Sequence, residues 1–179
     1  MGTVRCIKIL AGQESSKAFT HKDVIQYCKL TSREIVYLSE KKTVVPDIAD
    51  AHGYSSARQY SLRNLFEFAI AKILRQAGLE HAKIKIFIEA LQKINQLLSK
   101  EIQNNETYRS IIDQLGVFEM KIFDAQYMGI NIGQGTTDDI WHIALEQPYR
   151  LIRDYKEEYA ASVLIVRIDK VFSSLQELI

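Results

Sequence analysis

Side chains that can contact nucleic acid gather between residues 22 and 63 of this chain. Arginine and lysine bind phosphate, arginine also binds guanine edges, and serine and tyrosine hydroxyls hydrogen-bond to phosphate or base. Such residues can equally be ordinary solvated surface groups. The candidate contacts are Lys22, Ser32, Arg33, Val36, Tyr37, Lys41, Arg58, Tyr60 and Arg63.

Two short predicted helices carry the first of these residues. Thr20 is a good N-cap for a helix over residues 21–28, and Thr31 or Ser32 can cap a second helix over residues 33–39. In the second helix Ile35 and Leu38 face inward, while Arg33, Val36 and Tyr37 can face out. Two helices joined by three or four residues form a helix-turn-helix, whose second helix enters a DNA major groove, although the motif also occurs as plain structure.

The residues after this pair predict a wing and a long helix. Residues 43–46 and 58–60 can form two short strands, with a loop over residues 47–57 between them. Ser61 then caps a long helix that should stop at Ala77-Gly78.

These segments resemble the MerR, or mercury-resistance regulator, family of winged helix-turn-helix transcription factors. The family pattern runs from an Arg-x-Ile-Arg-Tyr helix through a strand ending in proline and an Arg-x-Tyr-Ser wing to a helix closing on Leu-x-x-x-Gly-Leu. The matching stretches here are Arg33-Glu34-Ile35-Val36-Tyr37, Thr43-Val44-Val45-Pro46, Arg58-Gln59-Tyr60-Ser61 and Leu74-Arg75-Gln76-Ala77-Gly78-Leu79.

The resemblance implies that residues 20–83 form a DNA-binding domain. It further implies a homodimer that binds a two-fold promoter site in double-stranded DNA and distorts that DNA, with RNA polymerase as a further partner. The chain departs from the pattern where Val36 replaces the usual arginine, where Leu38-Ser39 replaces an aromatic-glutamate pair, and where Lys42 replaces a glycine. The chain is therefore expected to recognise a DNA sequence that differs from those recognised by other members of the family.

A heptad-like pattern follows the predicted DNA-binding domain. Large apolar residues recur at spacings of 3, 4, 3 and 4, which is typical of a helix packing along another helix. We interpret residues 84–103 as a dimerisation helix, because a helix-turn-helix generally needs two copies to read a two-fold site. The alternative is a core helix inside one subunit. The seam residues are Ile84, Phe87, Leu91, Ile94 and Leu98.

The remaining segments predict a mixed α+β fold overall, mainly helical in its first part. Residues 1–19 form an N-terminal extension with a short strand over residues 4–10. Residues 104–179 are interpreted as a small α+β effector domain, with no recognisable ligand class. In it we expect helices over 106–115 and from Pro148 to about Tyr159, strands over 126–132, 140–145 and 162–168, and a closing helix capped by Asp169.

Composition narrows the functional classes. The net charge of +1 conceals a basic first half: residues 1–90 hold 14 Lys and Arg and 9 Asp and Glu, or +5, whereas residues 91–179 hold 9 and 13, or −4. This asymmetry fits a nucleic-acid-binding end joined to another part. With no long apolar run, a cytoplasmic protein without membrane contact is expected.

The chain offers no arrangement that predicts catalysis. Its two cysteines, Cys6 and Cys28, lie far apart, and its four histidines are scattered. We therefore expect no enzyme, no cofactor and no metal site. The main hypothesis is a MerR-like DNA-binding regulator. The alternative is an interaction protein that keeps the winged-helix fold but docks on a protein partner.

Overall fold

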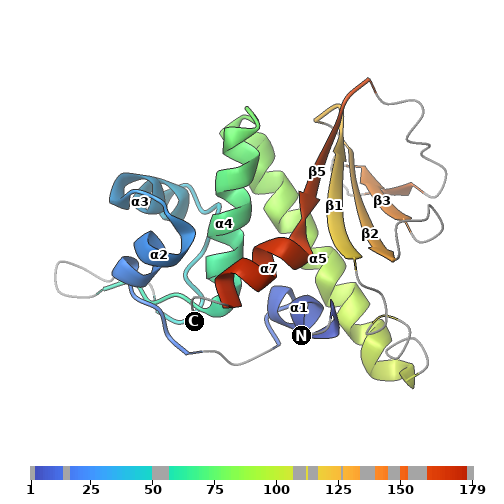
Figure 1. Ribbon diagram of the computed structural model, residues 1–179, viewed down its shortest axis with the longest axis horizontal. Coiled ribbons are helices and arrows are strands. Elements are labelled where there is room, and N and C mark those ends of the chain that lie inside the picture. The colour runs from blue at the N-terminus through green and yellow to red at the C-terminus, as the bar shows by residue number, and fades with distance from the viewer. Residues whose placement is uncertain are drawn as a thin grey trace.

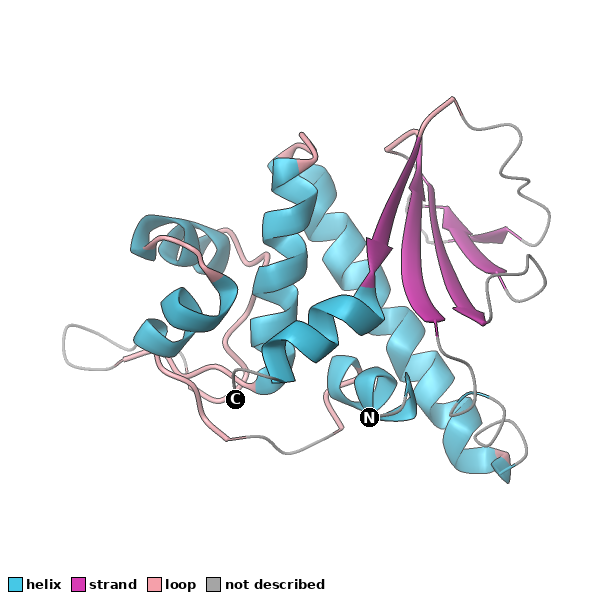
Figure 2. Ribbon diagram, viewed as in Figure 1, coloured by secondary structure: helices cyan, strands magenta, loops and turns pink. Residues whose placement is uncertain are grey.

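The computed structural model describes residues 3–13, 17–49, 57–106, 112, 117–125, 127–133, 140–144, 150–152 and 161–176. Helices formed by the first part of the chain stand beside an antiparallel sheet formed by the later part, as predicted for a mixed α+β fold (Figures 1 and 2). No helix in these ranges is long and apolar enough to cross a membrane. The helices before the sheet are α1 (Thr3–Leu10), α2 (His21–Cys28), α3 (Ser32–Glu40), α4 (Leu62–Gln76) and α5 (His81–Asn104).

The sheet has five antiparallel strands in the order β4-β3-β2-β1-β5. The three predicted strands, over residues 126–132, 140–145 and 162–168, are confirmed within about one residue at each end. The predicted helix after Pro148 is wrong for the described residues 150–152, which pair with β3 as a strand. The elements are β1 (Val117–Phe123), β2 (Tyr127–Gly133), β3 (Ile140–Ala144), β4 (Arg150–Ile152), β5 (Val163–Arg167) and α7 (Ile168–Gln176).

Two further helices are predicted in this part of the chain, and one of them lies within the described residues. The closing helix is present, but it begins at Ile168, so that Asp169 lies in its first turn rather than at the N-cap. The helix expected over 106–115 lies outside the described residues, apart from Glu106 and Ile112.

The predicted strand over residues 4–10 is wrong, because this segment is helix α1. Local β-branched content favoured a strand, but packing against α5, α4 and α7 decides the conformation. The helix buries residues on more than one side in the common core. Those residues are Val4, Cys6, Ile7, Ile9 and Leu10.

The predicted strand over residues 43–46 is absent as well. The amides of Thr43 and Val44 donate to the carbonyl of Leu38 at 2.9 and 3.2 Å, and the carbonyl of Val45 accepts from Asn64 Nδ2 at 2.9 Å. The backbone groups of this segment pair with α3 and α4. They are therefore not available for hydrogen bonds to another strand. The described bridges near it join Phe19 to Tyr60 and Ala49 to Gln59.

Helix α5 is a core helix of the single chain. All five predicted seam residues are 0–4 % exposed without a second copy. Helices α1 and α4 pack against α5, and its neighbours Asn95 and Ser99 are also fully buried. The assignment of Ile84, Phe87, Leu91, Ile94 and Leu98 as a dimer seam is therefore wrong, since these side chains are already covered within one subunit.

The sheet and the helices share one core. Phe172 of α7 stacks on Phe66 of α4 with ring centroids 5.0 Å apart, and α7 also contacts α1 and β1. In Figure 1, α7 runs from the end of β5 back across α4. The buried cluster includes Leu65 in α4, Leu91 in α5 and Met120 in β1. The packing thus crosses the predicted domain boundary at residue 104.

Candidate nucleic-acid interface

Helices α2 and α3 begin with the same local device. The Thr20 side chain accepts from the Asp23 amide, and the Asp23 carboxylate accepts from the Thr20 amide at 2.7 Å. Thr31 and Glu34 repeat this reciprocal pair at the start of α3. Both N-cap predictions are confirmed. Each pair supplies partners for amides that a helix start leaves unpaired, and these hydrogen bonds lower the pKa of both carboxyl groups.

A three-residue connection joins α2 to α3. Lys29 takes the left-handed conformation at φ 53°, and Leu30 turns inward, where it is 4 % exposed. The thiol of Cys28 donates to the carbonyl of Leu65 at 3.3 Å, and burial raises its pKa to about 12. Cys28 is thus a small core residue that ties the helix pair to α4.

The outer face of α3 carries the exposed candidate contacts. Ile35 and Leu38 are buried as predicted, while Arg33 is exposed and Tyr37 is 44 % exposed. Val36 is half-buried. Lys41, which follows α3, and Lys22 on α2 are exposed too. These four exposed side chains can reach a large polyanion without any rearrangement of the core.

Ser32 is exposed but already has a partner. Its Oγ lies 2.9 Å from Nε2 of His21, at the first residue of α2. Partial burial and the nearby Arg58 lower the pKa of His21, because both disfavour the protonated ring. Ser32 therefore holds the two helix starts together.

Tyr60 is not a surface contact. It is 0 % exposed, its ring meets Phe68 edge-on at 5.2 Å, and its hydroxyl lies 3.5 Å from Ser39 Oγ. Its backbone pairs with Phe19. The prediction that its hydroxyl reaches DNA is wrong, because the whole side chain fills the core between α3 and α4.

Arg63 is also removed from the interface. Its guanidinium lies 3.0 Å from Asp47 and 3.5 Å from Glu67, and its side chain is only 21 % exposed. The prediction of a DNA contact is wrong for Arg63, because its charge is taken up by two carboxylates. The sequence carried one signal for this role, the i, i+4 spacing of Arg63 and Glu67 on one helix.

Glu67 is the buried centre of that polar cluster. One carboxylate oxygen accepts from Asn64 Nδ2 at 3.0 Å, and the other accepts from Gln92 Nε2 of α5. Burial raises its pKa to about 7, and the opposing effect of Arg63 is the smaller one. Asp47 closes the cluster by accepting from the Ser61 hydroxyl at 2.6 Å. These bonds join the loop before α4 to α4 and α5.

Arg58 lies at the start of the second predicted wing strand. It is half-buried, and its charge is near enough to His21 to affect that ring. Residues 50–56 of the predicted wing lie outside the described residues. The bridge between Ala49 and Gln59 brings together the two chain segments on either side of that loop.

Two cavities lie beside this helical framework. The first, about 660 Å³, is bounded by α3, α4 and the start of α5. Its lining includes Arg33 and Tyr37 together with Lys72, Arg75 and His81. No pattern in the sequence indicated that these three additional side chains would lie beside α3. Their placement depends on how α4 crosses the helix pair.

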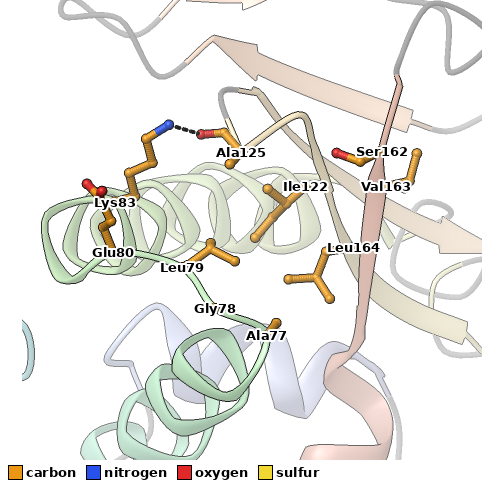
Figure 3. Close-up of a pocket in the computed structure, with 10 residues that line it drawn as sticks. All are labelled: Ala77, Gly78, Leu79, Glu80, Lys83, Ile122, Ala125, Ser162, Val163 and Leu164. Carbon is orange, nitrogen blue, oxygen red and sulfur yellow. Dashed lines mark hydrogen bonds between the residues drawn. The ribbon is translucent and has the colours of Figure 1, made fainter.

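The second cavity, about 580 Å³, lies between the α4–α5 turn and the sheet. Figure 3 shows Lys83 reaching across to the carbonyl of Ala125, a hydrogen bond of 2.9 Å, while Leu79, Ile122 and Leu164 form apolar walls. Of its ten lining residues, Glu80 and Lys83 are the charged ones. Because the charge of Glu80 offsets that of Lys83, the lining of this cavity carries no net charge with which to bind an ion.

Comparison with models of known protein families and with curated proteins found no match. The candidate function therefore rests on the geometry of the described residues.

Proposed function

We propose that this chain is a DNA-binding transcription regulator that contacts the major groove through α3. The observation that carries the proposal is the outward placement of Arg33 and Tyr37 on a second helix whose inner face is fully packed. Lys22 and Lys41 add positive charge on neighbouring elements. A short helix of this kind, preceded by a capped partner helix, is the geometry that places side chains on base edges.

Local acidic groups do little to oppose an approaching phosphate backbone. Asp23 and Glu34 direct their carboxylates to the amides of Thr20 and Thr31 at the helix starts. Glu40 is an exposed acid at the end of α3, next to Lys41 and Lys42. The net positive charge of residues 1–90 supports association with DNA at low salt.

Reading a two-fold promoter site needs two copies of the module, and we keep the homodimer as part of the proposal. The contact between copies has to use a surface other than the five buried seam residues of α5. On two-fold DNA the pair would distort the duplex, as the resemblance to MerR regulators implies. Titration of one selected duplex with the chain also gives the number of copies bound.

The test is selection of bound duplexes from a random DNA pool, followed by titration of one selected duplex. Arg33→Ala should weaken binding by roughly 1 to 3 kcal/mol and relax specificity at one base pair of each half-site. Lys100→Ala, which removes an exposed cation from α5, is the matched control and should bind like the parent. Absence of any enriched sequence, or an unchanged Arg33→Ala, would contradict the proposal.

A second candidate function is docking on a protein partner, and one observation favours it. Three large apolar side chains near the helix pair are exposed: Ile25 at 37 %, Val45 at 53 % and Ile48 at 42 %. The same DNA selection separates the two functions. A docking module would enrich no sequence, and Ile25→Ser would then weaken partner binding while Arg33→Ala would not.

A further inference from the structure

The 660 Å³ cavity beside α3 combines an apolar floor with a basic rim. Leu30, Leu38, Ala71 and Ile84 form the floor, and each of these side chains is at most 5 % exposed. Leu79, another lining residue, is half-buried. Apolar walls of this kind with a few polar groups at the edge are typical of sites for small organic molecules.

The rim has an excess of positive charge. Arg33, Lys72 and Arg75 contribute three cations, whereas Glu34 is the one acid among the lining residues. Glu34 is already engaged, because Thr31 donates to one of its oxygens and Arg75 lies 2.8 Å from the other. Arg75 keeps a 59 % exposed side chain, so part of its guanidinium remains accessible.

The groups around the cavity are held in place before any ligand arrives. Lys72 donates to the carbonyls of Cys28 and Lys29 at 3.2 and 3.0 Å, which fixes its ammonium at the end of α2. The ring of His81 meets Tyr37 edge-on at 4.8 Å and its Nε2 lies 3.1 Å from Thr43 Oγ1. Such prior ordering reduces the entropy lost on binding.

We propose that this cavity binds a small organic anion with an apolar body, of the class of aromatic carboxylates. The carboxylate would lie at the rim, near Arg33, Lys72 and Arg75. The ring system would cover the floor formed by Leu30, Leu38 and Ile84. A phosphate of the DNA backbone fits less well, because it brings no apolar group to cover the buried floor.

Such a ligand would also compete with DNA, and this part of the inference rests on the proposed function. Arg33 and Tyr37 belong both to the cavity and to the outer face of α3. An anion bound at the rim would neutralise Arg33 and occupy the space beside Tyr37. The occupied protein should therefore bind a selected duplex less tightly.

The probe is 2-naphthoate, with the uncharged naphthalene-2-carboxamide as its matched control. Calorimetric titration of the full chain should give one saturable site for 2-naphthoate, with a dissociation constant of roughly 0.1 to 1 mM. The carboxamide should bind about tenfold more weakly, because it carries no negative charge to pair with the guanidinium and ammonium groups of the rim. The NMR signals of the Tyr37 and His81 rings should shift with the same titration curve.

Variants locate the site. Lys72→Gln and Arg75→Gln should each weaken 2-naphthoate about fivefold to tenfold. Lys100→Gln, which removes an equal charge from an exposed position of α5, should leave it unchanged. If Lys72→Gln does not fold, Arg75→Gln alone decides, since its side chain is largely exposed.

The two proposals can fail separately. No saturable binding of 2-naphthoate to the parent at about 5 mM, equal affinity for the carboxamide, or full affinity in Arg75→Gln would overturn the site. Binding that follows the expected pattern in a chain that enriches no DNA sequence would keep the site and reject the proposed function. A selected duplex that binds equally with and without saturating 2-naphthoate would overturn the competition.

Discussion

The outer face of α3 and the start of α4 carry similar residue types in opposite environments. Arg33 and Tyr37 on α3 face water, whereas Arg63 and Tyr60 at the start of α4 are enclosed by carboxylates and aromatic rings. In the sequence both pairs qualify as DNA contacts. The difference teaches that an arginine or tyrosine becomes available to a ligand only where the fold leaves enough of its side chain exposed to solvent.

The largest expected effect separates buried from exposed positions on α5. Leu91 is 1 % exposed and Leu97 is 54 % exposed. Leu91→Asp should destabilise the fold by more than about 4 kcal/mol, because it places an unpaired carboxylate in the core. Leu97→Asp should change stability by less than about 0.5 kcal/mol. Urea unfolding measures both, and a folded Leu91→Asp monomer would restore the dimer-seam assignment.

The next effect compares the two arginines directly. Arg63→Ala should cost about 2 to 3 kcal/mol of stability, because it leaves Glu67 buried without its cation and removes the ion pair with Asp47. Arg33→Ala should cost less than about 0.5 kcal/mol and act on DNA affinity instead. Equal unfolding midpoints for the two variants would mean that the cluster around Glu67 does not hold the start of α4.

The pH dependence of stability sharpens the description of that cluster. The pKa of Glu67 is about 7 in the fold, against an ordinary value of 4.5. A raised carboxyl pKa means that the stability present below about pH 4.5 is lost as pH rises through 7, and the full difference corresponds to roughly 3 kcal/mol. Glu67→Gln should remove this loss, so that stability no longer declines as pH rises from about 5 to 8.

A second acid supplies the control for the pH experiment. The pKa of Glu34 is lowered, mainly by its hydrogen bond from the Thr31 amide, so its contribution to stability is lost as pH falls through that lowered value. Glu34→Gln should therefore change how stability depends on pH in the acid range, and its stability near neutral pH should vary with pH as in the parent. If the stability of Glu67→Gln still declined with pH near neutrality, the decline would belong to another group.

The smallest effect tests the backbone beside the α3 face. Lys42 follows Lys41, the C-cap of α3, and has φ 54°, in the left-handed region where glycine is favoured. Lys42→Gly should stabilise the fold by about 0.5 to 1 kcal/mol. Lys41→Gly removes the same charge at φ −76° and should give no gain, so thermal unfolding of the pair separates backbone strain from charge.

The sequence alone determined the limits of α2, α3 and α4. Threonine followed three residues later by an acid fixed the starts of α2 and α3, and Ser61 and Gly78 marked the limits of α4. These signals act through hydrogen bonds between residues close in the chain, so they can be recognised without knowledge of the fold. Three predicted strands also followed from local apolar patterns.

Tertiary structure decided the partners of these elements. The heptad pattern of α5 describes one apolar face, and packing alone determined that α1 and α4 cover it within the chain. Likewise, α1 is helical because its apolar side chains pack into the core in that conformation. Arg63 is enclosed because Asp47 approaches from a separate loop. Such contacts join residues distant in sequence, and spacing along the chain carries no information about them.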